Sequence, residues 1–150
     1  MAKLLISLVL ALFSTVPCTP IQTSEIELVQ GINNIRIRYG LSELPVDYDL
    51  SVIARYRARD LAEKNYFSHS PPDGCNYICL MEQHNLPIGY VGEIIAMNNY
   101  SWNETSLVAL QGWETSPSHL NIVIGTDYTK FGVGTFSVDD KIYHVAIFSD

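Results

Sequence analysis

Residues 131–148, FGVGTFSVDDKIYHVAIF, carry the clearest fold signal in the chain. The stretches 131–138 and 141–148 are rich in apolar residues and are separated only by Asp139 and Asp140, which predicts two strands joined there. In 141–148, apolar side chains fill both sets of alternating positions, which is typical of a strand covered on both faces. The C-terminal end therefore predicts strands packed between other layers.

Upstream of these strands the apolar spacing becomes that of helices. A helix is predicted over 25–39, opened by a Ser24–Glu27 capping box and ended at Gly40. Its apolar face follows steps of four, three and four: Leu28, Ile32, Ile35 and Tyr39.

A second helix is predicted over 50–64, capped by Asp49. One stripe of it is apolar: Leu50, Ile53, Ala54, Ala58 and Leu61. Charged residues mostly line the other side, which is expected to be solvated: Arg55, Arg57, Arg59, Asp60, Glu63 and Lys64. Further helices are predicted over 76–85 and 103–115, so helices come early and strands late, which indicates a layered α+β domain.

Length and composition favour one domain with a hydrophobic core and argue against a nucleic-acid-binding or membrane-spanning protein. The chain has 150 residues, of which 47% are hydrophobic and 17% charged, and this suits a single domain with a real core. Nine basic against 16 acidic residues give a net charge of −7, which argues against nucleic acid and anionic membranes as partners. No stretch after the N-terminal segment is apolar for long enough to form a transmembrane segment in the mature chain.

The N-terminal 19 residues are predicted to be a signal peptide. Lys3 precedes an apolar run over 4–16, and Pro17 and Pro20 follow it. The alternative is a buried helix or strand. Cys18 lies where a bacterial lipoprotein is acylated, so the expected localisation is secreted or extracellular, with a lipid anchor through Cys18 as the alternative to simple secretion.

Cys75 and Cys79 form an even pair once Cys18 is removed or acylated. In an oxidising compartment they favour a disulfide, while free thiols and a metal site remain alternatives. Two glycosylation sequons begin at Asn99 and Asn103 and suggest a surface loop over 97–104, provided that the source glycosylates exported proteins.

Three polar residues lie in places where chemistry could occur. His69 follows Tyr66 and Phe67 in a proline-rich turn, and His119 follows a Ser-Pro-Ser segment. Glu93 is a lone carboxylate in an apolar stretch, and a buried carboxylate needs a partner such as histidine. The alternative is that all three are satisfied polar residues without a shared function.

Two further histidines are interpreted as structural. His144 lies in the last predicted strand, where packing is expected, and His84 lies at a helix end on the surface. The usual catalytic signatures are missing, including HExxH, GxSxG, the P-loop and GxGxxG.

Over residues 25–148 the chain resembles the CAP superfamily: the cysteine-rich secretory, antigen 5 and pathogenesis-related 1 proteins, also called SCP-like proteins. The short form resembles its prokaryotic branch. The resemblance rests on motifs that occur in the family's order: Leu28-Val-Gln-Gly-Ile-Asn33, Tyr39-Gly-Leu41, Asp49-Leu50, Ala54-Arg55, Ala58-Arg-Asp60, Tyr66-Phe-Ser-His69, Pro72-Asp-Gly74, Gly89-Tyr90, Gly92-Glu93, Trp113, Ser116-Pro-Ser-His119 and Phe131-Gly-Val-Gly134.

The resemblance implies a CAP/SCP-like domain over 25–150, folded as a three-layer α-β-α sandwich with a central, mostly antiparallel sheet. It also implies a cleft in which His69 and His119 hold Zn²⁺ or another divalent cation, with Glu93 as the first acid. For the second acid, Glu114 is the nearest candidate, since Ser116 stands at the family's position.

The resemblance gives the fold more directly than the function. The favoured hypothesis is a secreted, non-catalytic binding module whose cleft takes a divalent cation or a small apolar ligand. One alternative is an extracellular protein-interaction protein in which the polar cluster is structural. Another is a zinc-dependent hydrolase with Glu93 as the general base.

Overall fold

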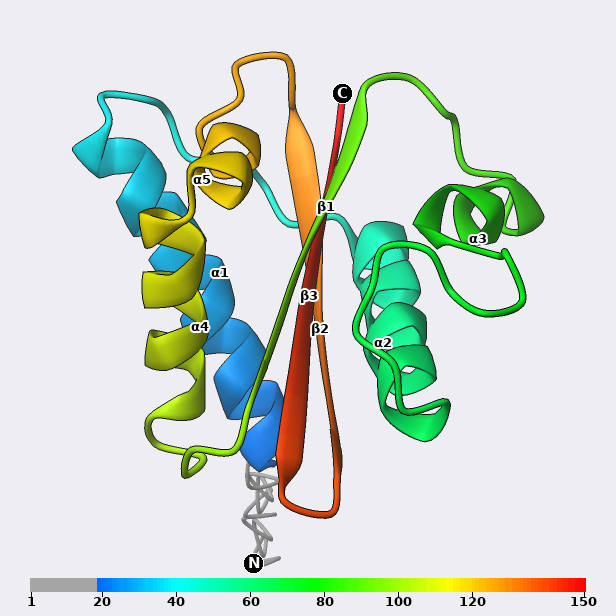
Figure 1. The fold of residues 1–150 in the computed structure, drawn as a ribbon. Coiled ribbons are helices and arrows are strands. Elements are labelled where there is room, and N and C mark those ends of the chain that lie inside the picture. Colours follow the sequence, from blue (N-terminus) through cyan, green and yellow to red (C-terminus); the bar gives the residue numbers. More distant parts are fainter. Residues whose placement is uncertain (1–18) are drawn as a thin grey trace, which may run out of the picture.

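The computed structural model describes residues 19–150, so the predicted signal peptide over 1–19 and Cys18 lie, apart from Thr19, outside the described residues. The helices are α1 Pro20–Arg38, α2 Tyr48–Glu63, α3 Tyr77–Gln83, α4 Thr105–Thr115 and α5 Pro117–Val123. The strands are β1 Val91–Asn98, β2 Lys130–Val138 and β3 Lys141–Ser149. Figure 1 shows the sheet edge-on between two helical layers.

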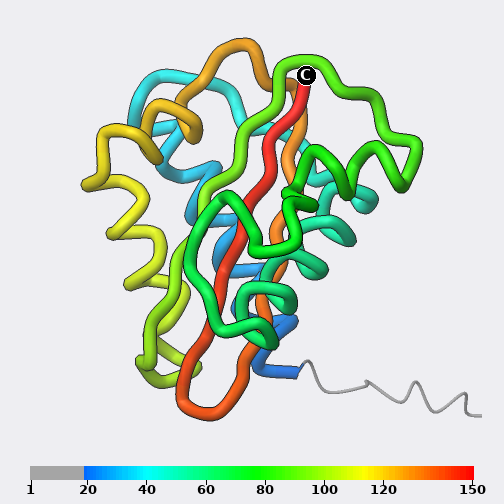
Figure 2. Tube along the Cα trace, turned by 45° about the vertical axis from the view of Figure 1, so that its right-hand side comes forward, coloured from blue at the N-terminus to red at the C-terminus, as the bar shows by residue number. Residues whose placement is uncertain are grey.

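The sheet has the order β1-β3-β2, and both pairings are antiparallel. β2 and β3 form the predicted hairpin, in which Val138 pairs with Lys141 and Asp139 takes a positive φ of 53° in the turn. Figure 2 shows this hairpin running the length of the molecule. β3 is the central strand, which explains why its side chains are apolar on both faces.

Each face of the sheet has its own apolar core. On one face α1, α4 and α5 pack around Leu28, Ile32, Trp113, Phe131 and Phe148. On the other face α2 and α3 pack around a second cluster that includes Ile53, Leu61, Met81, Tyr143 and Ile147. This arrangement confirms the predicted α-β-α sandwich with an antiparallel sheet.

The apolar stripe predicted for the second helix is buried as expected, and the approach of α2 to the sheet depends on glycine. A Cβ on Gly134 would lie 2.2 Å from the backbone nitrogen of Arg55, and one on Gly132 would lie 2.2 Å from that of Ser51. Only hydrogen fits at these positions because the α2 backbone crosses directly over β2.

Three details of the predicted elements are wrong. The first helix begins at Pro20, because Thr19 and Gln22 form the capping box; Ser24 is instead buried and its hydroxyl bonds that of Ser106 at 2.7 Å. The second begins at Tyr48, because the side chain of Asp47 accepts from the Leu50 backbone at 2.9 Å.

Arg57 is the third error: it was expected on a solvated face, but its side chain is fully buried. Two elements, β1 and α5, had not been predicted. In β1 the residues Gly92 and Glu93 interrupt the apolar pattern, so the strand signal is weak. No helix within residues 19–150 is long and apolar enough to cross a membrane.

Candidate functional site

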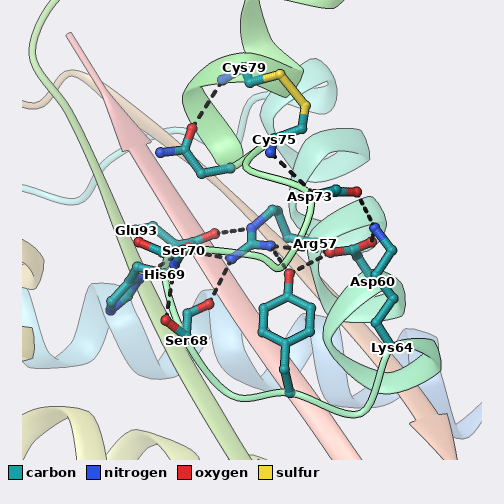
Figure 3. Close-up of polar contacts among 12 residues, drawn as sticks. Arg57, Asp60, Lys64, Ser68, His69, Ser70, Asp73, Cys75, Cys79 and Glu93 are labelled. Atoms are coloured by element: carbon teal, nitrogen blue, oxygen red, sulfur yellow. Dashed lines mark hydrogen bonds and ion pairs between the residues drawn. A yellow bond between two sulfur atoms is a disulfide. The ribbon is translucent and has the colours of Figure 1, made fainter.

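Glu93 on β1 belongs to a polar cluster in which it contacts Arg57 and His69 (Figure 3). Its Oε2 accepts from Arg57 Nε at 2.7 Å, and its Oε1 accepts from Arg57 Nη2 at 3.2 Å and from His69 Nδ1 at 2.8 Å. The side chains of Glu93 and Arg57 are both 0% exposed, whereas that of His69 is 50% exposed. The carboxylate therefore connects a buried cation to a surface imidazole.

Arg57 reaches Glu93 from α2 and also holds the loop that carries His69. Its Nη2 donates to the backbone oxygen of Ser68 at 3.2 Å, and its Nη1 donates to the hydroxyl of Tyr66, which in turn donates to Asp60. Burial alone lowers the pKa of Arg57, but the hydrogen bonds and charge of Glu93 outweigh it, and the pKa is raised overall. The guanidinium thus stays charged and positions the loop.

The same cluster also changes the pKa of the Tyr66 phenol. Burial and the hydrogen bond to Asp60 raise the pKa of Tyr66 to about 12, although Arg57 acts in the opposite direction. Tyr66 therefore stays protonated at neutral pH and donates to Asp60.

His119 enters the site from α5, in the opposite helical layer. Its Nδ1 is buried and has no hydrogen-bond partner among the described residues. Burial lowers the pKa of His119, and the neighbouring His69 lowers it further. His119 is therefore a neutral imidazole at neutral pH, with one buried ring nitrogen left without a hydrogen-bond partner among the described residues.

A hollow of about 300 Å³ adjoins His119 between β1 and α4. Apolar side chains make up much of its lining, and the exposed Phe67 of the His69 loop borders it. Trp113 also borders it and donates from Nε1 to the backbone oxygen of Ile95 at 3.1 Å. The site thus combines imidazoles with an apolar surface.

Glu114 lies apart from this cluster. Both of its carboxylate oxygens accept from Arg38 Nη2 at 2.7 Å, and the residue borders a different hollow, between α1 and α4. On a helix, Trp113 and Glu114 point in different directions, so a buried Trp113 directs Glu114 away. The structure brings together His69 and Glu93, with His119 nearby, but does not bring Glu114 to them.

The donor set for a metal ion is small. Within the part of the chain that the structure describes, no three or more His, Cys, Asp or Glu side chains are grouped to hold a metal ion. His69 and His119 would supply two imidazole nitrogens at most. Glu93 bonds Nδ1 of His69 and so orients the ring, an arrangement typical of metal-bound histidine.

The remaining two histidines lie where they were predicted to lie, His144 packed in the sheet and His84 on the surface at a helix end. His144 is fully buried, with Nε2 at 2.7 Å from the Thr105 hydroxyl and Nδ1 at 3.0 Å from that of Thr135. Burial lowers the pKa of His144 to about 4. His84 is exposed and its ring lies 5.6 Å from that of Tyr56.

Cys75 and Cys79 form a disulfide, so the favoured prediction for this pair is confirmed. It closes the segment that links the His69 loop to α3 (Figure 3). Asn99 and Asn103, the two sequon asparagines, are exposed between β1 and α4.

Arg57 is the site residue that sequence analysis missed. It stands four residues after Ile53 and four before Leu61, so it belongs to the apolar stripe of α2 by spacing. A charged residue inside an apolar stripe indicates a buried ion pair, and this signal was available in the sequence.

The three-layer sandwich, with two histidines and a buried carboxylate near one edge of its sheet, defines the class of protein that the sequence resembles. A profile of the Cysteine-rich secretory protein family, CAP, matches residues 29–148, and the chain belongs to this family.

Two curated relatives from Bacillus subtilis (strain 168) match this chain. The uncharacterized membrane protein YlbC is 32% identical over 121 residues, which cover 81% of this chain and 33% of YlbC. The uncharacterized protein YkwD is 29% identical over 110 residues, which cover 73% of this chain and 41% of YkwD. The chain thus matches less than half the length of either relative.

Solved structures share the fold. An extracellular protein containing an SCP domain from Bacillus anthracis superposes with a TM-score of 0.75 at 26% identity, covering 91% of this chain and 45% of that one. An outer surface protein from Borrelia burgdorferi gives 0.73 at 23% identity, covering 85% and 92%. The structure of NaASP2 with Zn²⁺ gives 0.62 at 13% identity, covering 89% and 83%.

Proposed function

We propose that this chain is an exported, non-catalytic binding module that holds a divalent cation, Zn²⁺ or an ion of similar chemistry, between His69 and His119. The observation that carries this proposal is the buried Nδ1 of His119, which has no partner among the described residues. A buried polar atom of this kind calls for a ligand such as an ion or water.

The chemistry of the two imidazoles supports a cation. Glu93 accepts from His69 Nδ1, which leaves the Nε2 of His69 free to ligate. The lowered pKa of His119 keeps this ring neutral, as a metal ligand must be. A bound cation would supply a Lewis-acidic point with coordination positions left for water or for a partner's donor atom.

The state of Glu93 argues for binding rather than hydrolysis. A general base needs a free oxygen within reach of the water that it deprotonates. Both oxygens of Glu93 are engaged by Arg57, and Oε1 also by His69, and its side chain is 0% exposed. Glu93 is therefore better placed to orient His69 than to act as a general base.

Export is supported by independent observations. The Cys75–Cys79 disulfide suits an oxidising compartment. The similar proteins from Bacillus anthracis and Borrelia burgdorferi are described as extracellular and as an outer surface protein. The NaASP2 structure contains Zn²⁺, which supports the choice of ion.

Calorimetric titration of Zn²⁺ into metal-free protein at neutral pH tests the cation site. We expect saturable binding that disappears in the His69→Ala/His119→Ala double variant. The matched control is His84→Ala, which removes an exposed histidine outside the site and should leave the titration unchanged. Binding that persists in the double variant, or a folded wild-type protein that binds no Zn²⁺, would contradict the proposal and favour a structural role for the cluster.

A further inference from the structure

The outer edge of β1 has free hydrogen-bonding groups. Within residues 19–150, β1 is paired only with β3, and in an antiparallel pair alternate residues direct their backbone groups toward the partner strand or away from it. The Trp113 indole identifies Ile95 as an outward residue, because it donates to the carbonyl of Ile95. Since the N–H and C=O of one residue in an antiparallel strand point to the same side, the N–H of Ile95 and both groups of Met97, two residues further on, also point outward. Outside the β1–β3 pairing, no hydrogen bond within residues 19–150 involves these three groups.

The opposite edge of the sheet is largely closed by the chain itself. On β2, Phe131 accepts from the Asp47 N–H at 2.8 Å and donates to the Pro45 oxygen at 3.2 Å. Four residues further along β2, the N–H of Thr135 donates to the carboxylate of Glu25 at 3.1 Å. The same carboxylate forms an ion pair with Arg55. Natural sheets cover edges in this way to prevent unwanted pairing, so the less protected edge of β1 stands out.

A hollow lies directly beside the free edge of β1. It is the space of about 300 Å³ between β1 and α4, bordered by Phe67 and Met97, which are 50% and 40% exposed. Gly112 of α4 also borders it, and a Cβ added there would have no heavy atom within 4 Å. The hollow therefore has room for an apolar side chain presented alongside β1.

Charge limits what the edge can bind. The residues that line the hollow include no Lys, Arg, Asp or Glu, while the chain carries a net charge of −7. A partner segment with acidic residues would be repelled by this field, a basic one would be attracted, and a neutral one would be neither repelled nor attracted.

We propose that the free edge of β1 binds an extended, neutral or basic peptide segment by strand addition, with one apolar side chain of the peptide in the hollow between β1 and α4. The peptide backbone pairs with Met97 and with the N–H of Ile95, and alternate side chains point to opposite faces, as in other strand-addition complexes. The segment then leads towards His69 and His119, although the pairing itself requires no cation.

The test uses a fluorescein-labelled, amidated pool of hexapeptides with Leu at a fixed central position and Lys, Thr or Val elsewhere. Fluorescence anisotropy of this pool is measured against the full protein in the presence of a chelator. We expect saturable binding, and weaker binding of a pool in which Asp replaces Lys. Absence of saturable binding by the Lys pool, or equal binding of the Asp pool, would overturn the proposal.

Two substitutions at Gly112 test whether a side chain of the peptide binds in the hollow between β1 and α4. Gly112→Leu places a side chain in the hollow and should weaken binding by about tenfold or more, as loss of a central anchor does. Gly112→Ala adds a methyl group only and should bind as the wild type does. Equal binding by a folded Gly112→Leu protein would overturn the assignment to the hollow.

Backbone pairing is tested separately. Met97→Pro removes only an outward N–H of an edge strand, where proline is tolerated, and N-methylation of the peptides removes the opposing donors. Both changes should weaken binding, and binding that survives both would overturn strand addition. Peptide binding that appears only after Zn²⁺ is added would also overturn the proposal, because it would assign the peptide to the cation rather than to the edge.

Discussion

Arg57 of α2 and Glu93 of β1 form an ion pair with both side chains 0% exposed and Nε 2.7 Å from Oε2. The pair joins α2 to β1, the strand at one edge of the sheet. The Glu93 carboxylate also accepts a hydrogen bond from His69 Nδ1 at 2.8 Å. Because each charge has lost its water, each depends on the other to remain in the interior.

Breaking this pair should be costly. Glu93→Gln or Arg57→Met is expected to lower the free energy of unfolding by about 3–5 kcal/mol, since either leaves a buried polar or charged group without its partner. Urea unfolding followed by circular dichroism measures this loss. Glu114→Gln is the control: it breaks the more exposed pair with Arg38 and should cost about 0–1 kcal/mol. Equal losses in both cases would contradict the buried character of the Arg57–Glu93 pair.

The buried His144 should make stability depend on pH. Its pKa is about 4 in the folded protein against about 6.5 for histidine in an unfolded chain, so between these values the unfolded chain binds a proton that the folded chain does not. Stability from this group is full above pH 6.5 and falls as the pH drops towards 4, by about 3 kcal/mol in total.

The unfolding midpoint in urea, measured across this pH range, tests the His144 prediction. His144→Gln removes the titrating group and should flatten the corresponding part of the profile, although other groups keep their own contributions. A profile with the same slope in the wild type and in His144→Gln would assign the pH dependence to other residues.

The close approach of α2 to β2 should not tolerate a side chain at Gly134. Gly134→Ala places a Cβ 2.2 Å from the Arg55 backbone nitrogen and is expected to lower the free energy of unfolding by about 1–3 kcal/mol or more. Gly112→Ala is the matched control in an open helical position and should raise stability by up to about 1 kcal/mol. Thermal unfolding of the two variants should shift in opposite directions, and a shift in the same direction would contradict the packing of α2.

The Cys75–Cys79 disulfide should contribute modestly to the free energy of unfolding, because it closes a short segment. With a sequence separation of four, chain-entropy arguments give about 2 kcal/mol. Unfolding with and without dithiothreitol measures the contribution, and the Cys75→Ser/Cys79→Ser variant should show no such effect of the reductant. If reductant destabilises the variant as much as the wild type, the effect does not come from this bond.

Residue patterns predicted some features of the site correctly and missed others. The stripe Ile53–Ala54–Leu61 predicted the buried face of α2 correctly, but the same spacing includes Arg57, which was assigned to solvent because of its charge. Glu93 was predicted to need a buried partner. Histidine was the expected one, and His69 does bond it, but the fully buried partner is Arg57, 36 residues earlier in the chain. No local pattern specifies which of several distant cations meets a carboxylate.

The order of motifs along the chain indicated the family. Local apolar spacing and a two-residue turn determined the hairpin of 131–148, the apolar face of the second helix, and that of the first helix apart from Tyr39, which is 49% exposed. The tertiary structure alone decided that Arg57 is buried against Glu93, that Glu114 pairs with Arg38 on another surface, and that the edge of β1 stays open beside the hollow. These features depend on how α2, α4 and α5 are placed around the sheet, and that placement is set by packing between residues far apart in the sequence.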